Sequence, residues 1–253
     1  MIFDTHAHYD AEQFDADRDA LLRSLPEKGV SLVLDPGCDG ESSAKCAALA
    51  ACYPHVYAAV GWHPEEWAGW TEHSPEQLRA LARLDKVVAI GEIGLDYHWD
   101  TGHKALQREM LETQLAMALE LDLPVIIHDR DAHEDCLNIV SCFPGLRGVF
   151  HCYSGSAEMA EILLRDGWSL GFDGPVTYKS NRKAAAVLAV TPAERILVET
   201  DSPYMAPEPC RGRRNDSTLL PYIIGRIAEL KGMDARELEE QTRRNGEALF
   251  GIA

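Results

Sequence analysis

Residues 87–92 read VVAIGE, residues 104–121 read KALQREMLETQLAMALEL, and residues 123–128 read LPVIIH. The first and third stretches are short and apolar, with β-branched residues, which is typical of parallel strands that are covered on both faces. In the middle stretch apolar side chains repeat at helical spacing, and Pro124 opens the stretch that follows. The pattern predicts a strand, a helix and a second strand of one parallel sheet.

The same alternation runs through the whole chain. Apolar runs that predict strands lie at residues 1–3, 30–34, 56–61, 87–90, 123–127, 146–150, 168–172 and 195–198. Helical patterns lie between them, and two more at residues 216–230 and 234–250 close the chain. We therefore expect an α/β fold, a single (β/α)8 TIM barrel over residues 1–253, with its active site at the C-terminal ends of the strands. A doubly wound open sheet is the alternative, although no Gly-x-Gly-x-x-Gly or Walker loop supports its nucleotide-binding version.

The composition is that of an ordinary globular protein. The 253 residues are 46% hydrophobic, enough for a sizeable core, and no apolar run approaches the ~20 residues of a membrane span. The N-terminus has no basic region followed by an apolar stretch, so we expect no secretory signal. The seven cysteines are odd in number and widely spaced, which suits reduced thiols. We expect a cytoplasmic protein, without a membrane partner, that acts as a monomer.

The charge of the chain limits how it could bind nucleic acid. A formal net charge of −17 argues against a broad electrostatic surface for a polyanion. If the substrate is a nucleic acid, metal ions and a few basic residues must attract it locally. The simpler interpretation of the excess acid is solubility.

Residues of the types that bind metal ions fall at the ends of the predicted strands. They are His6, His8, Glu92, His128, His151 and Asp201. In a barrel the C-terminal ends of the strands converge on one mouth, so residues far apart in sequence would meet there. His6 and His8 are two residues apart at a strand end and point the same way in an extended chain, so both can hold one ion.

These residue types suit a particular chemistry. Imidazole nitrogen and carboxylate oxygen are ligands for Zn²⁺, Mn²⁺, Co²⁺ or similar ions. Four histidines and two acids can form two adjacent sites if one carboxylate bridges them. Two ions about 3.5–4 Å apart can lower the pKa of a shared water and stabilise both oxygens of an in-line displacement at phosphorus. Taken singly, a histidine could be a core residue, and Asp201 could form a turn before Pro203. The coincidence over five strand ends favours the metal site.

Longer blocks of sequence carry a family resemblance. They are Asp4–His8, Gly61–Pro64, Gly91–Tyr97, Ile127–Arg130, His151–Gly155, Gly174–Lys179, Glu199–Tyr204 and Arg211-Gly212-x-x-Asn215. With these blocks the chain resembles, over essentially its whole length, the TatD family of metal-dependent deoxyribonucleases, within the amidohydrolase-like barrels. The resemblance implies a 3′-to-5′ exonuclease acting on the ends of DNA, with RNA as a second possible substrate.

The resemblance also implies roles for the predicted ligands. The implied ligands of one ion are His6, His8 and Asp201, and those of the second are His128 and His151. The two catalytic residues are Glu92, which would bridge the ions, and Asp201, which would orient the attacking water and take its proton. The ions would be two divalent cations, with Zn, Mg, Mn, Co and Ni as the candidates.

Four residues near the predicted mouth are candidates for substrate binding: His63, Arg130, Tyr153 and Arg211. His63 could donate to a phosphate, and an arginine can pair with a phosphate through two bonds. Tyr153 could stack on a terminal base, as could Tyr204. The structural alternatives are a packed loop histidine, an ion pair of Arg130 with a neighbouring aspartate, and core packing of the tyrosines. Lys179 is a further candidate for phosphate, or a solvated side chain.

Two other functions remain open from the sequence. One is a metal-dependent amide or ester hydrolase, such as a deacylase acting on aminoacyl-tRNA. Many related sites bridge their metals with a modified lysine after the fourth strand, whereas this chain has Glu92 there. The other is a non-catalytic metal-binding interaction protein, against which the complete ligand set argues.

Overall fold

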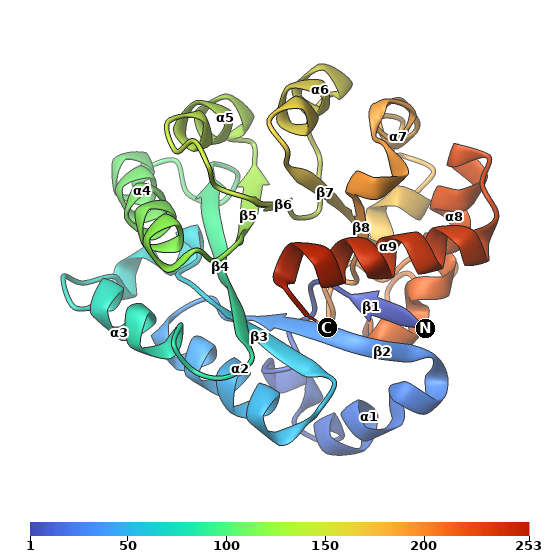
Figure 1. The fold of residues 1–253 in the computed structure, drawn as a ribbon, viewed down its shortest axis with the longest axis horizontal. Helices are drawn as coiled ribbons and strands as arrows, with labels where there is room; N and C mark the ends of the chain where they lie inside the picture. The colour runs from blue at the N-terminus through green and yellow to red at the C-terminus, as the bar shows by residue number, and fades with distance from the viewer. Residues whose placement is uncertain (253) are drawn as a thin grey trace. The chain divides into compact units, whose positions relative to one another are not determined.

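The computed structural model describes residues 1–252. The chain forms two compact units. The terminal unit consists of Met1–Asp35 and the chain from Cys152 onward, and the middle unit is Pro36–His151. In both units strands alternate with helices along the chain, as the colours of Figure 1 show. The predicted single domain over residues 1–253 stays a prediction.

The middle unit contains four parallel strands in chain order. Its elements are α2 (Gly40–Cys52), β3 (Val56–Val60), the 3-10 helix η3 (Pro64–Gly69), α3 (Ser74–Leu81), β4 (Val87–Asp96), α4 (Lys104–Leu121), β5 (Val125–Arg130), α5 (His133–Ser141) and β6 (Gly148–Phe150). Helix α2 packs on β3, and α4 packs on β4. The strands are therefore covered by the helices that connect them, as the continuously apolar strand pattern predicts.

The terminal unit contains the other four strands. Its elements are β1 (Ile2–Asp4), η1 (Glu12–Phe14), α1 (Arg18–Ser24), η2 (Pro26–Lys28), β2 (Val30–Pro36, whose last residue belongs to the middle unit), α6 (Ala157–Arg165), β7 (Ser169–Phe172), η4 (Gly174–Thr177), α7 (Ala184–Val190), η5 (Ala193–Arg195), β8 (Ile196–Val198), η6 (Ser217–Leu219), α8 (Leu220–Lys231) and α9 (Ala235–Phe250). Strand β1 pairs in parallel with β2, and β7 with β8.

The last strand lies beside the first. The backbone nitrogen of Thr5 donates to the carbonyl of Val198 over 3.2 Å, and Ala7 forms a parallel bridge with Ser202 just beyond the two strands. A sheet that closes on itself needs this pairing of its first and last strands. Together with parallel neighbours that follow chain order, it confirms the predicted (β/α)8 class over the doubly wound alternative.

Helix α9 covers β1 and β8 of the terminal unit (Figure 1). Its buried residues are Leu238, Thr242, Gly246 and Phe250, four apart along the helix and therefore on one face. The side chain of Asp234 caps the helix by accepting from the backbone nitrogens of Arg236 and Glu237. Thus the C-terminal helix closes the apolar side of the strand that precedes His6.

Most predicted bounds of helices and strands agree with the structure, but two strands, β4 and β5, extend further than predicted. Helix α4 begins and ends where the periodicity places it, at Lys104 and Leu121. Strand β4, however, continues past Ile90 to Asp96, and β5 continues to Arg130. The prediction that Glu92 follows its strand and that His128 ends its strand is therefore wrong. The parallel ladder depends on backbone groups, so it continues after the apolar run has ended.

None of the helices of residues 1–252 is both long and apolar enough to cross a membrane. All seven cysteines are free thiols.

Strands β4 and β5 approach each other closely around Glu92, and two glycines allow this. A Cβ atom on Gly91 would lie 2.6 Å from the Cβ of Ile126. Gly94 has a φ of +157°, and a Cβ there would lie 1.9 Å from the carbonyl oxygen of His128, its partner in the register of the two strands. Any larger residue at position 94 must displace the backbone that carries His128.

We predict that Gly94→Ala destabilises the fold by at least about 2 kcal/mol, because the added methyl group meets backbone at a positive φ. The matched control is Gly225→Ala on α8, where a Cβ has no heavy atom within 4 Å. This control should be neutral or gain up to about 1 kcal/mol from helix propensity. Urea unfolding of the two variants measures both values, and an equal effect of the two substitutions would contradict the close approach described above.

Candidate metal centre

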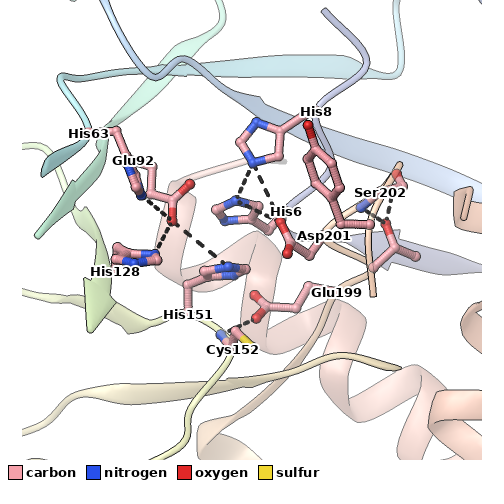
Figure 2. Close-up of polar contacts among 12 residues, drawn as sticks. His6, His8, His63, Glu92, His128, His151, Cys152, Glu199, Asp201 and Ser202 are labelled. Carbon is pink, nitrogen blue, oxygen red and sulfur yellow. Dashed lines mark hydrogen bonds and ion pairs between the residues drawn. The ribbon is translucent and has the colours of Figure 1, made fainter. Parts of the chain in front are cut away.

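The terminal unit brings three predicted ligands together. His6 and His8 follow β1, and Asp201 lies in the turn after β8. The two Nε2 atoms are 3.1 Å apart, and Asp201 Oδ1 lies 3.5 Å from His8 Nε2 and 3.9 Å from His6 Nε2 (Figure 2). His6 is fully buried, whereas the side chains of His8 and Asp201 are 11% and 14% exposed. Solvent therefore reaches this donor set from the side of Asp201 and His8.

Backbone hydrogen bonds hold these donors in place. The nitrogen of Asp201 donates to the carbonyl of His6 over 2.9 Å, and the nitrogen of His8 donates to the carbonyl of Ser202 over 2.7 Å. Asp201 adopts a positive φ of 54°, a region that aspartate tolerates better than most residues. The turn is thus fixed against the segment that carries both histidines, and the predicted same-side geometry of His6 and His8 is confirmed.

A buried carboxyl group supports this turn from beneath. Asp4 Oδ1 accepts from the backbone nitrogens of Thr200 and His6, and its Oδ2 accepts from the hydroxyl groups of Thr200 and Ser217. Burial raises the pKa of Asp4 to about 7, although these four hydrogen bonds act in the opposite direction. Asp4 therefore joins β1, the Asp201 turn and η6 without facing solvent.

The middle unit gathers a second donor set around a buried carboxylate. Glu92 Oε1 lies 2.9 Å from His128 Nδ1, 3.7 Å from His63 Nε2 and 3.9 Å from His151 Nε2 (Figure 2). These side chains come from β4, β5, the segment after β3, and the residue after β6. The side chain of Glu92 is only 4% exposed, so its charge needs partners close by.

Asp96 holds the ring of His128 from its other side. His128 Nε2 and Asp96 Oδ2 are 3.1 Å apart, and Asp96 is fully buried. Burial by itself lowers the pKa of His128, but the hydrogen bonds to Asp96 and Glu92 outweigh it and raise this pKa to about 9. Burial by itself raises the pKa of Asp96, but the bonds from His128 and from the backbone of Trp99 and His98 lower it to about 2.

Both donor sets fit a divalent cation. Ligand atoms that bind one ion at about 2.1 Å with tetrahedral angles lie roughly 3.4 Å from one another. The donor distances of the terminal unit run from 3.1 to 3.9 Å, and those of the middle unit from 2.9 to 3.9 Å. In addition, two imidazole nitrogens that face each other at 3.1 Å need a cation or a proton between them. Mixed nitrogen and oxygen donors suit Zn²⁺, Mn²⁺ and related ions.

Sequence reasoning missed two acids of the site. Asp96 lies on the same face of β4 as Glu92, four residues further on, and would have been found had the strand been extended past Ile90. Glu199 is buried at the end of β8, and its carboxylate lies within 4.8 Å of a ring nitrogen of His6. Its Oε1 accepts from the backbone nitrogen of Cys152 over 2.6 Å. Glu199 lies two residues before Asp201, the spacing that places two side chains on the same side of an extended chain, and this spacing could have indicated Glu199 as a site residue.

The substrate-binding candidates have different surroundings. His63 is part of the donor set of the middle unit, since its ring centroid lies 4.4 Å from that of His128. Arg130 packs over Trp99 at 5.3 Å, and within residues 1–252 it makes no ion pair with Asp129 or Asp131, the structural alternative. The hydroxyl of Tyr153 donates to the carbonyl of Ser156.

Arg211 lies in the terminal unit, with its guanidinium 4.3 Å from the centroid of the Tyr178 ring. Tyr204 is 52% exposed, and its hydroxyl accepts from Gln13. The substrate-binding roles of all these residues stay predictions.

A (β/α)8 fold with imidazole and carboxylate donors at its strand ends is typical of metal-dependent hydrolases. The comparison with known proteins agrees with this class and narrows it. The model of the TatD related DNase family matches residues 3–251. The chain belongs to this family and is a metal-dependent hydrolase.

Relatives and solved structures match over nearly their whole length. A Bacillus subtilis protein named uncharacterized metal-dependent hydrolase YabD is 40% identical over 254 residues, which is 100% of both chains. A Cronobacter sakazakii protein named 3′-5′ ssDNA/RNA exonuclease TatD is 37% identical over 259 residues, covering 98% of this chain and 97% of its own. The crystal structure of YJJV, a TatD homolog from Escherichia coli, has a TM-score of 0.94 at 33% identity and covers 100% of this chain and 98% of its own.

We predict that Asp96→Asn lowers the pKa of His128 in the metal-free protein by at least about one unit, because the substitution removes an anionic partner. Titration of the imidazole signals by NMR measures this value. Asp100→Asn is the control, since the carboxylate of Asp100 bonds to His103 instead. An unchanged His128 titration in Asp96→Asn would contradict the assigned contact.

The raised pKa of His128 makes the stability of the metal-free protein depend on pH. The folded-state pKa of about 9 exceeds the ordinary 6.5, so the protonated His128 stabilises the metal-free fold below pH 6.5, and this contribution is lost as the pH rises through 9. A histidine must be neutral to bind a metal ion, so metal binding by His128 below pH 9 releases a proton.

Proposed function

We propose that the chain is a 3′-to-5′ exonuclease that hydrolyses phosphodiester bonds at the ends of single-stranded DNA or RNA. The observation that carries the proposal is the pair of donor sets, His6 with His8 and Asp201, and Glu92 with His128 and His151, in a member of the TatD family. Relatives that match over the whole chain carry the name of such an exonuclease. Neither an amide or ester hydrolase nor a non-catalytic metal-binding protein is favoured over it.

The proposed cofactors are two divalent ions, with Zn, Mg, Mn, Co and Ni as candidates. When bound, such ions lower the pKa of water and offset the negative charge that develops at phosphorus. We assign His6, His8 and Asp201 to one ion and His128 and His151 to the other, as the family resemblance implies. Glu92 is the proposed shared ligand; it is supported by a carboxylate that already faces three histidine rings.

Asp201 is the proposed general base. Its carboxylate is the most exposed group of its donor set, and backbone hydrogen bonds fix its turn. A carboxylate held in this way can orient the attacking water and accept its proton. Asp96 is a positioning residue, because its carboxylate lies 3.1 Å from Nε2 of His128 and so fixes the ring whose Nδ1 faces Glu92.

The place of action is also proposed. Seven free cysteines suit a reducing compartment, so we assign the protein to the cytoplasm. We assign it a monomeric state, with nucleic-acid ends as its partners.

We predict that Asp201→Asn lowers kcat at least about 100-fold, because the variant loses the proton acceptor and one charged ligand. The assay uses end-labelled single-stranded DNA and RNA with each candidate metal ion, and the product ladder gives the direction of digestion. The control is Asp85→Asn, an exposed residue that should retain the rate of the wild type.

Two results would overturn the proposed function. One is the absence of cleavage with every divalent metal, and the other is a rate for Asp201→Asn equal to that of the wild type. Activity on an ester or aminoacyl panel with none on nucleic acid would favour the hydrolase alternative.

A further inference from the structure

Two loops of the terminal unit carry positive charge that the chain as a whole lacks. The chain has 24 Lys and Arg against 41 Asp and Glu. The loop after β7, residues 173–183, and the loop after β8, residues 199–216, contain six exposed cations, whereas Glu208 is their one exposed acid. The cations are Lys179, Arg182, Lys183, Arg211, Arg213 and Arg214. A quarter of the basic residues therefore lies on two loops at the C-terminal ends of neighbouring strands.

The two loops are packed against each other. The hydroxyl of Tyr178 donates to the carbonyl of Ala206 over 2.9 Å, and Thr177 Oγ1 accepts from the backbone nitrogen of Glu208 over 2.9 Å. A Cβ atom on Gly174 would lie 1.6 Å from the carbonyl oxygen of Met205, so the backbones touch at this glycine. The two loops are thus packed together, and Arg211 of one lies against Tyr178 of the other, with its guanidinium 4.3 Å from the ring centroid.

One of the six cations, Arg214, is used in contacts within the fold. Arg214 donates from both terminal nitrogens to the carboxylate of Asp17, over 2.7 and 2.6 Å, and also to the carbonyl of Gln13. Its charge is therefore neutralised within the fold. By contrast, none of the side chains of Lys179, Arg182, Lys183 and Arg213 makes an ion pair within residues 1–252. We define the basic rim as the other five cations together with Tyr178: Tyr178, Lys179, Arg182, Lys183, Arg211 and Arg213.

The basic rim is tied to the turn that carries Asp201. Asn215, directly after the arginine segment, is buried, and its Nδ2 donates to the carbonyls of Thr200 and Tyr204, each over 2.8 Å. The backbone nitrogen of Tyr204 donates in turn to the carbonyl of Asp201 over 2.9 Å. The loop that carries Arg211 and Arg213 is therefore anchored to the turn of Asp201.

The side chains of the rim suit phosphates of a flexible strand. Lysines and arginines on loops can follow a backbone whose phosphates are not in a fixed register. Arg211 stacks on the ring of Tyr178, and its Nη1 lies 3.9 Å from Oε1 of Glu208. Both side chains of this pair are exposed, so solvent screens it and a phosphate can compete with Glu208 for the guanidinium. The net charge of −17 opposes a duplex that lies across the rest of the molecule, so the attraction is confined to this place.

We propose that the basic rim binds backbone phosphates of the single strand, on the side of the scissile bond that stays uncleaved. This inference rests on the proposed function and extends it, because it assigns the residues that hold the strand between successive cuts. Affinity then grows with strand length until the rim is filled, and it falls with salt concentration because phosphate contacts release counterions.

The test measures binding separately from cleavage. The rim variant is Lys179→Gln combined with Arg182→Gln, and the charge-matched control is Arg236→Gln combined with Arg244→Gln, two exposed residues of α9. The probes are fluorescein-labelled oligothymidines of two and of about 12 nucleotides, a length within the site sizes of single-strand-binding proteins. Anisotropy is recorded with the full chain in EDTA over a range of salt concentrations.

We expect the rim variant to bind the longer probe several-fold more weakly than the wild type. The slope of log affinity against log salt concentration should be smaller in magnitude by about 1.4, from two lost contacts at about 0.7 each. The control should retain the affinity and slope of the wild type. Equal affinities and slopes in the rim variant and the control would overturn the proposal.

A second assay distinguishes a failure of the rim proposal from a failure of the proposed function. Hydrolysis of thymidine 5′-p-nitrophenyl phosphate by the metal-loaded wild type reports diester chemistry on a substrate without further phosphates. If the wild type hydrolyses no diester but the rim variant alone loses binding of the longer probe, the exonuclease proposal fails and the rim is supported. If the wild type hydrolyses the diester and the rim variant binds like the control, the rim fails alone.

Discussion

The middle unit depends on the burial of one carboxylate. Glu92 is almost inaccessible to solvent, and a buried charge is unfavourable unless opposite charges or hydrogen-bond donors surround it. Histidine rings from three neighbouring segments supply these partners, and Gly94 lets the backbone of β5 come close enough to present His128. A cation shared among carboxylate and imidazoles satisfies the same requirement, which is why this arrangement suits metal binding.

The terminal unit meets a related requirement in a different way. Its acid, Asp201, is mostly buried but reached by solvent, and backbone hydrogen bonds fix its turn against the segment that carries His6 and His8. Asp4 completes this support from within the core. The same turn anchors, through Asn215, the loop that carries part of the basic rim. Chemistry and the capture of the strand are thus proposed to use one rigid segment.

Much of the fold and of the candidate metal centre could be predicted from the sequence, for a physical reason. Helix α4 has a strong apolar periodicity, and the strand-end positions of His6, His8, His151 and Asp201 follow from parallel strands. Asp96 cannot be placed from the sequence, where the apolar run ends at Ile90, because a ladder of backbone bonds leaves no mark on side-chain polarity. The basic rim could not be predicted from the sequence either. Lys179 and Arg211 are 32 positions apart, and only the packing of two loops brings their segments together.

We propose that the two donor sets bind divalent ions and that Glu92 serves both. Anomalous diffraction from crystals grown with Mn²⁺ tests it most directly, with the wild type and Glu92→Gln compared at equal metal concentration. We expect one anomalous peak at His6, His8 and Asp201, one at His128 and His151, and a loss of both in the variant. Two peaks of undiminished height in Glu92→Gln, or none at these residues in the wild type, would contradict it.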